Sequence, residues 1–595
     1  MHHNPNRDEG RMEKSVNTDR NYKDVRTATP VLAESQLKFR IGLARQRTQS
    51  YPLDSMDFIM MDLERPDGCR RFADFCTGDL TGRMLESLSC SDGIDGKSDP
   101  RLNVLFERIL KNRLPSGLFG RPGFVVPNPG DNECFAVCAR YFPGFIRYHA
   151  LTGDSRALDA AIGLADLTLR NRDAWYNKLK QSGGRAIELW ITEPLALLYG
   201  VTGNKEYLDF VGMINDGLAM PDKGAHTHGY LATLRGLQLA ALITGDAAWG
   251  EKPEAARRMI VENHYETPDG GVAECFPPNK RNEGCAIADW LMLNLNAGLL
   301  GDDDAAYDKA ERIFWNALAF NQWMNGGFGL RSVTQKGYGV QEFEEAWCCC
   351  VHHAGMAMTE YARHAVTFRN QTVRINLLVP GCYRLTLDHG RTIEVRIETR
   401  YPSAASATIS ATGIPADVQV RVRIPGCVKD AVLSESREGE SLQVSLTGRL
   451  GHTLEDCQPG VVLKYGPLVL TRSSHYNGPT MDQPEDLANV MIGGGAVSLP
   501  KGTEVLLLKD RVGQDGFLHL SDKPRPTWTY DDEIPGGPCW IEGAPVNVAV
   551  KFANGEIHEL RFAPMCSNLS FYTLHETTVR YDLGSHNKDK ETIPR

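Results

Sequence analysis

A short phrase that ends one helix and starts the next recurs through the middle of the chain. It consists of an aliphatic residue, Thr, Gly and then Asp or Asn, at residues 151–154, 201–204 and 243–246, with a shorter form at 300–302. Glycine adopts the left-handed conformation that ends a helix, and the following Asp or Asn can cap the next one. The spacing of roughly fifty residues is that of a repeated helical hairpin. Residues from about 130 to 365 are therefore predicted to be helical.

Amphipathic stretches lie between these phrases and support the same interpretation. Residues 157–169 and 307–320 place apolar side chains at helical spacing. Hairpins of this size that close on themselves form an (α/α) barrel, whose open end offers a concave pocket. A linear helical solenoid is the competing arrangement.

The pattern changes after about residue 366. Residues 372–377 and 418–424 alternate with period two, and Pro and Gly break the runs, which is typical of a β-sandwich. A chain of 595 residues is also too long for a single core. The expected fold class is multidomain α+β, a helical (α/α)6-type barrel followed by β-sandwich domains. The expected division is a polar N-terminal arm at 1–60, a catalytic barrel at 61–365, a β-sandwich at 366–480 and a second β-rich domain at 481–595.

The charge balance restricts the class of partner. The net charge is −10 and no long run of Lys or Arg occurs, whereas nucleic-acid and anionic-membrane partners need a basic face. We therefore expect a neutral substrate, no nucleic acid and no membrane, and we allow for a homodimer. The first thirty residues are polar and lack the apolar core of a secretory signal, so a cytoplasmic location is expected.

The cysteines carry the strongest chemical signal. Three of the 15 are adjacent, Cys348 to Cys350, and adjacent cysteines are poorly placed to cross-link a secreted framework. Glu283 and Cys285 form a carboxylate-x-thiol pair, and two thiols of the run would complete a set of four ligands of the kind that zinc takes. The simpler alternative is that these cysteines pack as small buried hydrophobes and that Glu283 stabilises a helix N-terminus. The spacing alone leaves both alternatives open.

Two segments, 270–285 and 344–353, resemble glycoside hydrolase family 127 (GH127), the β-L-arabinofuranosidases. That family carries a Glu-x-Cys pair and a later Cys-Cys pair that together hold zinc, and one thiolate of the later pair is its nucleophile. The resemblance implies a Zn²⁺ cofactor with the ligands Glu283, Cys285, Cys349 and Cys350. It also implies that Cys349 is the catalytic nucleophile and Glu274 the acid/base.

The resemblance extends over most of the chain. Residues 185–188 and 199–203 lie where the family has a comparable helix, and residues 464–470 resemble its Gly-Pro-Leu-Val strand. The implied fold, an (α/α) barrel followed by β-sandwiches, agrees with the patterning found independently. This chain departs from the family where Val-His-His follows the cysteine run and where Cys348 adds a cysteine, so the register of the pair can shift by one.

The resemblance implies retaining hydrolysis of a carbohydrate substrate in two steps. His226 and His228 are candidate donors to substrate hydroxyls, and His352 is a candidate residue of the pocket lining; a capping, helix-starting or core role is the alternative for each. Two other functions stay open. One is a sugar epimerase or lyase on the same toroid, which would use histidine bases and would not need the cysteines. The other is a non-catalytic zinc-containing carbohydrate-binding protein.

Overall fold

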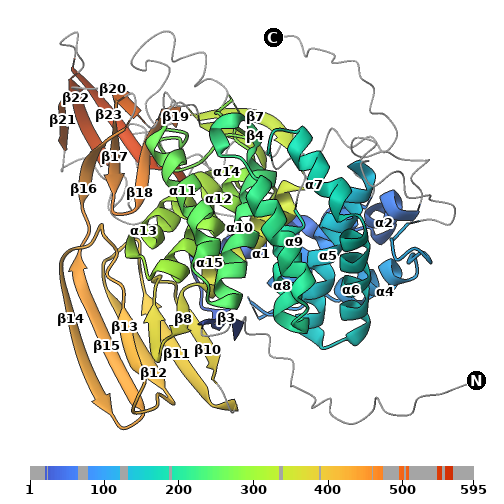
Figure 1. The fold of residues 1–595 in the computed structure, drawn as a ribbon. Helices are drawn as coiled ribbons and strands as arrows, with labels where there is room; N and C mark the ends of the chain where they lie inside the picture. Colours follow the sequence, from blue (N-terminus) through green and yellow to red (C-terminus); the bar gives the residue numbers. More distant parts are fainter. Residues whose placement is uncertain are drawn as a thin grey trace, which may run out of the picture.

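In the computed structural model, helices form most of the chain up to residue 363 and sheets follow, so that the architecture is mixed α+β (Figure 1). No helix among the described residues is both long and apolar enough to cross a membrane. The structure describes residues 21–22, 25–64, 78–94, 96–120, 132–185, 190–279, 281–323, 325–333, 339–346, 348–387, 390–457, 460–473, 495–496, 498–500, 504–507, 546–551 and 557–566.

The helices follow one another with short connections. A 3-10 turn, η1 (Pro221–Lys223), precedes α10, and a π-helical segment, η2 (Ile313–Leu318), continues α13. The α-helices are α1 (Gln36–Thr48), α2 (Met56–Glu64), α3 (Asp79–Ser91), α4 (Arg101–Leu110), α5 (Asn132–Thr152), α6 (Ser155–Arg170), α7 (Arg172–Gln181), α8 (Thr192–Thr202), α9 (Lys205–Gly217), α10 (Thr227–Thr244), α11 (Ala248–Glu262), α12 (Gly284–Gly301), α13 (Asp304–Arg312), α14 (Ala319–Asn321) and α15 (Cys350–Arg363).

The recurring phrase acts as expected at helix junctions. Gly203 ends α8 with a φ of 72°, and Asn204 caps α9 by accepting a hydrogen bond from the backbone N–H of Glu206. The shorter form differs in one respect, because Asp302 rather than glycine takes the left-handed conformation, with a φ of 56°. Asp303 then caps α13.

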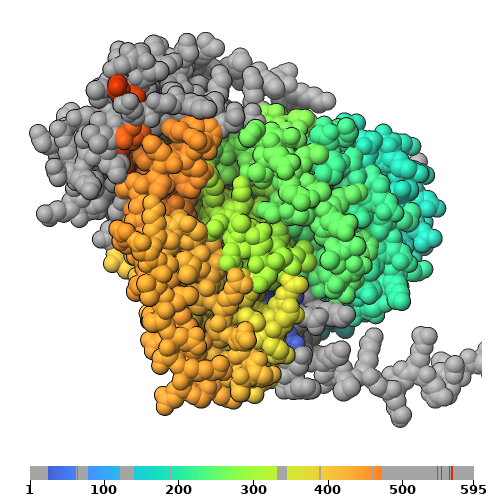
Figure 2. Space-filling model, turned by 60° about the vertical axis from the view of Figure 1, so that its left-hand side comes forward, coloured from blue at the N-terminus to red at the C-terminus, as the bar shows by residue number. Residues whose placement is uncertain are grey.

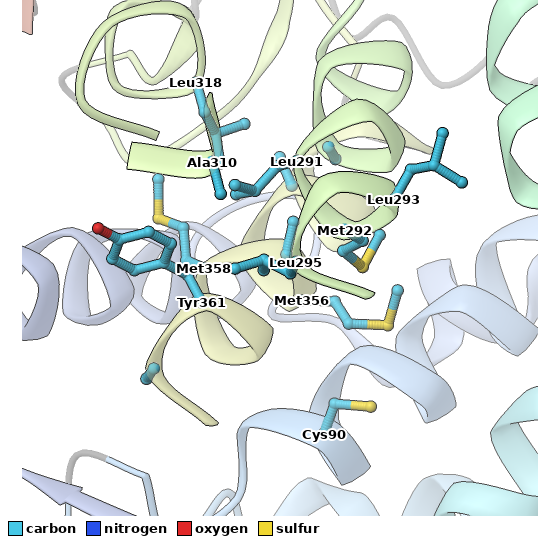
Figure 3. Packing of buried hydrophobic residues seen from close by; sticks show 14 of the residues in the cluster. Cys90, Leu291, Met292, Leu293, Leu295, Ala310, Leu318, Met356, Met358 and Tyr361 are labelled. Carbon is cyan, nitrogen blue, oxygen red and sulfur yellow. The ribbon is translucent and has the colours of Figure 1, made fainter. Parts of the chain in front are cut away.

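Helices α10 and α12 form the centre of the helical part. Nearly all their residues are buried, which is the property of a helix that is covered by protein on every side. Figure 3 shows leucines of α12 packed against Met356, Met358 and Tyr361 of α15. The two helices that carry the glutamate and cysteine motifs, α12 and α15, are therefore held in the core.

The described strands form three large sheets and two small ones. A five-stranded sheet has the order β1 (Asn21–Tyr22), β2 (Val25–Thr27), β8 (Val366–Arg369), β9 (Thr372–Ile375), β13 (Gln419–Val422). A six-stranded antiparallel sheet has the order β14 (Lys429–Glu438), β15 (Ser441–Arg449), β12 (Ala407–Thr412), β11 (Thr392–Thr399), β10 (Gly381–Thr386), β3 (Thr29–Leu32). Burial alternates along β10 and β11, so one face of this sheet is packed, as the period of two predicted. Figure 2 shows this region, in yellow to orange, as one flank of the molecule beside the helices.

The N-terminal segment differs from the expected polar arm at 1–60. Strand β2 pairs with β8 and strand β3 pairs with β10, so residues 25–32 join both sheets. Helix α1 buries Leu37, Ile41 and the guanidinium of Arg40. Residues 25–60 are therefore part of the folded core; their short strands carry too few residues for an alternating pattern to show. Residues 1–20 of the expected arm lie outside the described residues.

The third sheet crosses the expected domain boundary at residue 480. Its described order is β16 (His452–Asp456), β17 (Gly460–Tyr465), β18 (Leu468–Ser473), β23 (Ile557–Pro564), β22 (Val546–Lys551), β21 (Glu504–Leu507), with β19 (Gly495–Ala496) beside β18 and β20 (Ser498–Pro500) beside β17. Because β18 pairs with β23, strands from both sides of residue 480 share one sheet. Two antiparallel two-stranded pairs remain, β4 (Ala225–His226) with β5 (Cys275–Phe276) and β6 (Gly329–Val333) with β7 (Gly339–Glu345).

Candidate active site

The N-termini of α12 and α15 meet at the predicted zinc ligands. Glu283 is the N-cap residue of α12 and Cys285 lies in its first turn. Cys349 is the N-cap residue of α15 and Cys350 is its first residue. A helix N-terminus carries a partial positive charge and lowers the pKa of a nearby thiol. Two helix starts in one place therefore favour negatively charged side chains there.

These four residues form one buried group, which we call the thiol cluster: Glu283, Cys285, Cys349 and Cys350. One ligand atom from each lies within 4.8 Å of all the others. The Sγ atoms of Cys285 and Cys350 are 3.5 Å apart, and those of Cys349 and Cys350 are 3.8 Å apart. The structure thus brings together all four predicted ligands. Cys348 is buried beside them and does not belong to the group.

The thiol cluster fits a zinc ion by the chemistry of its donors. Three thiols and one carboxylate are ligands that zinc binds in proteins. The carboxylate oxygen Oε2 of Glu283 is buried, and Nε2 of His226 lies 3.3 Å from it without the full geometry of a hydrogen bond. A buried carboxylate oxygen with one such contact can accept a further interaction, and a bound cation would supply it.

Within the thiol cluster, Cys349 is the thiol most easily ionised. The thiols of Cys285, Cys348 and Cys350 stabilise its thiolate by hydrogen bonding and hold its pKa well below the usual range, against the effect of burial. The guanidinium of Arg83 lowers it further. Burial raises the pKa of the three donor thiols. The residue that the resemblance implies as nucleophile is therefore the one whose thiolate this environment favours.

Glu274 lies at the edge of the thiol cluster, on the bend immediately before β5. One of its carboxylate oxygens lies within 4.8 Å of a carboxylate oxygen of Glu283 and of a ring nitrogen of His226. It accepts hydrogen bonds from Nε and Nη2 of Arg281 at 2.9 and 2.5 Å and from the amide of Asn279 at 3.1 Å. Burial alone would raise the pKa of Glu274, but the bonds from Arg281 outweigh it and lower the pKa. In this structure Glu274 is therefore held as a carboxylate.

His226 faces the same place and is the most accessible of the three predicted substrate-binding histidines. Its Nε2 lies 3.3 Å from Oε2 of Glu283, and its side chain is 34% exposed. Burial lowers the pKa of His226, but the interaction with Glu283 exceeds that effect and the pKa is raised. His226 can therefore present a proton donor next to Glu283 and Glu274.

His228 is placed differently from the sequence prediction. Its side chain is only 2% exposed, its Nδ1 hydrogen-bonds to Asp289, and its Nε2 lies 3.4 Å from Nη2 of Arg140. The ring of Trp190 lies beside it, with the centroids 5.4 Å apart. Burial keeps the pKa of His228 well below its usual value, so the ring is neutral. Both ring nitrogens are engaged inside the protein, and this position does not suit a donor to substrate.

His352 is also buried, on the first turn of α15. Burial lowers its pKa to about 3, so the ring is neutral, and neither ring nitrogen has a hydrogen-bond partner among the described residues. The structure therefore does not bring His352 together with Glu274 and His226. The change from the expected pocket lining follows from the helix, which begins at Cys350 and turns His352 inward.

A second buried group consists of His228, Asp289 and His353. Its three side chains are close enough to hold a metal ion, but each histidine already hydrogen-bonds to the Asp289 carboxylate. Arg235 lies 3.2 Å from Asp289, and Arg140 lies beside His228. Two guanidinium groups at such short range disfavour a cation, so we assign this group to hydrogen bonding and not to metal binding.

The sequence reasoning missed Asp289 and Arg281. Asp289 follows Cys285 by four residues, and His353 follows Cys350 by three, spacings that place each pair on one helix face. That spacing was a usable signal for a second layer of polar residues below the thiol cluster. Arg281 reaches Glu274 because the backbone N–H of Glu274 donates to the carbonyl of Arg281, a turn that the sequence does not reveal.

No protein-family model and no curated protein sequence matches the chain. Among solved structures, a GH127 β-arabinofuranosidase has a TM-score of 0.62 at 15% identity, covering 91% of this chain and 95% of that chain. A GH127 β-L-arabinofuranosidase from Geobacillus stearothermophilus T6 has a TM-score of 0.62 at 15% identity, covering 92% and 98%. The chain has the GH127 fold. A structure described as a glycoside hydrolase has a TM-score of 0.60 over 92% of this chain. These structures establish the fold. At 15% identity they do not establish the activity, which depends on the residues of the site.

Proposed function

We propose that the protein is a retaining glycoside hydrolase of the β-L-arabinofuranosidase type that uses Cys349 as nucleophile. One observation carries the proposal: the thiol cluster forms at two helix N-termini, with Glu274 at its edge, in a chain with the GH127 fold. Proximity alone would also fit a structural metal site. The favoured ionisation of Cys349 and the two groups beside the cluster, Glu274 and His226, support catalysis instead.

In the first step, the Cys349 thiolate attacks the anomeric carbon while Glu274 gives its proton to the leaving oxygen. The bond to the leaving oxygen breaks and a thioglycosyl bond forms. In the second step, Glu274 takes a proton from water, and the resulting hydroxide displaces the sulfur. Two displacements at one carbon return the starting anomeric configuration.

A zinc ion bound by Glu283, Cys285, Cys349 and Cys350 would keep the thiols ionised and hold the sulfur of Cys349 in place. The chain's own groups contribute the rest. His226 would donate a hydrogen bond to a sugar hydroxyl at the mouth of the cluster. Burial of the thiols excludes water from the nucleophile, which strengthens the electrostatic interactions around it.

Arg281 has a defined part in this reaction. The first step needs Glu274 protonated, whereas the hydrogen bonds from Arg281 favour the carboxylate. The second step needs the carboxylate as a base. Arg281 therefore favours the form that activates water, and the bound substrate has to weaken this ion pair before Glu274 can act as an acid.

The finer features of the fold belong to the same proposal. We take the helices from α3 to α15 to form an (α/α)6-type barrel around the thiol cluster and the antiparallel sheets to form β-sandwiches behind it. A carbohydrate substrate, a cytoplasmic location and an allowance for a homodimer remain predictions of the sequence.

The test is a panel of aryl glycosides that includes both anomers of L-arabinofuranoside, with the product configuration followed by proton NMR. The proposal expects turnover of the β-L-arabinofuranoside and release of the product with unchanged configuration. Release with inverted configuration would contradict the double displacement. A protein that holds zinc and binds the sugar but turns over no member of the panel would be the non-catalytic alternative.

A further inference from the structure

Asp289 lies one helical turn below the thiol cluster and connects the three helices that carry the site. It shares a face of α12 with Cys285, four residues earlier. Its Oδ1 lies 2.9 Å from Nε2 of His353, three residues after Cys350 on α15. Its Oδ2 hydrogen-bonds to Nδ1 of His228 in the first turn of α10. A single carboxylate thus bridges α10, α12 and α15.

The carboxylate of Asp289 is fully buried, and the surrounding donors satisfy it. Nε of Arg235 lies 3.2 Å from Oδ1, and both histidines contribute further polar contacts. A carboxylate without these contacts would be strongly disfavoured at this depth, so they have to stay in place together. The bridge is therefore rigid, because no member can leave without stranding a buried charge or polar atom.

The same contacts select one proton position on His228. Since Nδ1 donates to Asp289, Nε2 is left as an acceptor and can receive a hydrogen bond from Nη2 of Arg140 at 3.4 Å. The guanidinium of Arg140 in turn stacks 3.9 Å from the ring centroid of Trp190. Asp289 thereby determines the hydrogen-bonding pattern of a chain of side chains that ends at Trp190.

We propose that Asp289 is a positioning residue for the thiol cluster. Through His353 it sets the distance between the N-termini of α12 and α15, which carry the four ligands. Through His228 it holds the start of α10, two residues after His226. Asp289 contacts neither substrate nor metal; it keeps the groups that do so in register. The inference rests on the proposed function in one respect, that the thiol cluster binds zinc.

The experiment compares zinc affinity in the full-length protein and its Asp289→Asn variant, by competition with a chelator of known affinity and without any substrate. Asparagine has the same shape, but its amide replaces an acceptor by a donor. Because the charged Arg235 lies beside Oδ1, the amide oxygen should stay on that side and the NH2 group should face Nδ1 of His228. The proton of His228 would then have to move to Nε2, where it would point at the N–H of Arg140. We expect zinc affinity to fall roughly 10- to 100-fold, the effect of losing a residue that orients metal ligands.

Two further variants separate positioning from general stability. Glu311→Gln alters a carboxylate of similar burial that is bonded to Arg423 and Tyr401, and it should lower the melting temperature without changing zinc affinity. His353→Gln keeps an N–H that can reach Asp289 and should retain affinity, whereas His353→Ala should lose as much as Asp289→Asn. If Asp289→Asn binds zinc like wild type while losing the stability that Glu311→Gln loses, the residue is merely structural and the inference is wrong.

Zinc affinity and glycosidase activity of the wild-type protein separate a failure of the proposed function from a failure of the role of Asp289. Wild type that binds zinc tightly but cleaves no glycoside would overturn the proposed function and leave the role of Asp289 standing. Wild type without measurable zinc affinity would overturn both.

Discussion

Two buried clusters of ionisable side chains differ in how their charge is balanced. Between the helices and the sheets, the guanidinium of Arg423 is 0% exposed and lies 2.6 Å from Glu311, with Asp308 on its other side. Tyr401 donates a hydrogen bond to Glu311 at 3.0 Å. The buried guanidinium of Arg423 neutralises the buried Glu311, while Asp308 is 41% exposed and partly hydrated. In the thiol cluster, by contrast, three thiols and a carboxylate converge, and the positive groups beside them are the partly exposed His226 next to Glu283 and the guanidinium of Arg83, which lowers the pKa of Cys349.

The two clusters therefore differ in what they can do. An ion pair with all its members present holds two parts of a fold together, because separating it would leave a buried charge. A set of buried acidic donors is unfavourable unless enough positive charge joins it, and a bound zinc ion would supply that charge.

Replacing the nucleophile should have the largest effect. Cys349→Ser should reduce turnover by on the order of 10⁴-fold or more, because an alcohol is hardly ionised at neutral pH and zinc holds it less well. Steady-state kinetics with the best aryl glycoside measures this. Cys348→Ser tests the register: activity that survives the change at 349 but not the change at 348 would move the nucleophile by one residue.

Removing the acid/base should have the next largest effect. Glu274→Gln should lower turnover of natural glycosides by roughly two to four powers of ten, while zinc content stays at the wild-type level. A substrate with a good leaving group needs no protonation in the first step, so a covalent adduct on Cys349 should accumulate. Peptide mass spectrometry would locate it. Full activity of Glu274→Gln on natural glycosides would exclude this role.

The balanced cluster should respond in stability and not in chemistry. Arg423→Met leaves Glu311 and Asp308 without their shared cation and should lower the free energy of unfolding by about 3–5 kcal/mol. Denaturant unfolding measures the loss. Turnover per folded molecule and zinc content should be unchanged. A loss of zinc in this variant would show that the two clusters are coupled, contrary to this prediction.

The smallest effect should be a change in pH dependence. Arg281 lowers the pKa of Glu274, so the protonated acid that the first step requires is lost as pH rises through that pKa. Arg281→Gln should raise the pKa and move the basic limb of the kcat/KM profile to higher pH, with a gain of a few-fold at neutral pH. An unchanged limb would mean that Glu274 does not control this step.

Local features of the fold, and the grouping of Glu283, Cys285, Cys349 and Cys350, were predictable from the sequence. The helix stops and caps, such as Gly203 and Asn204, depend on neighbouring residues only. Strand alternation after residue 366 is likewise local. The Glu-x-Cys pair and the cysteine run each resemble a known motif. Each of these signals is contained in a short stretch of sequence.

Features that depend on which elements become neighbours were not predictable. Strands β2 and β3 are too short to show a pattern and are held by partners more than 300 residues away. The pairing of β18 with β23 crosses the expected boundary for the same reason. His228 was expected at the substrate because its partner Asp289 is 61 residues away in the sequence, and the residues around His228 do not indicate this contact.

The central claim is that the thiol cluster is a zinc site, and metal analysis tests it most directly. Protein purified without chelator should contain about one zinc per chain, because four suitable ligands converge. Cys285→Ser should lower zinc content and melting temperature together, since metal binding contributes to folding. Wild-type protein with no zinc, or Cys285→Ser with the full wild-type content, would contradict the claim.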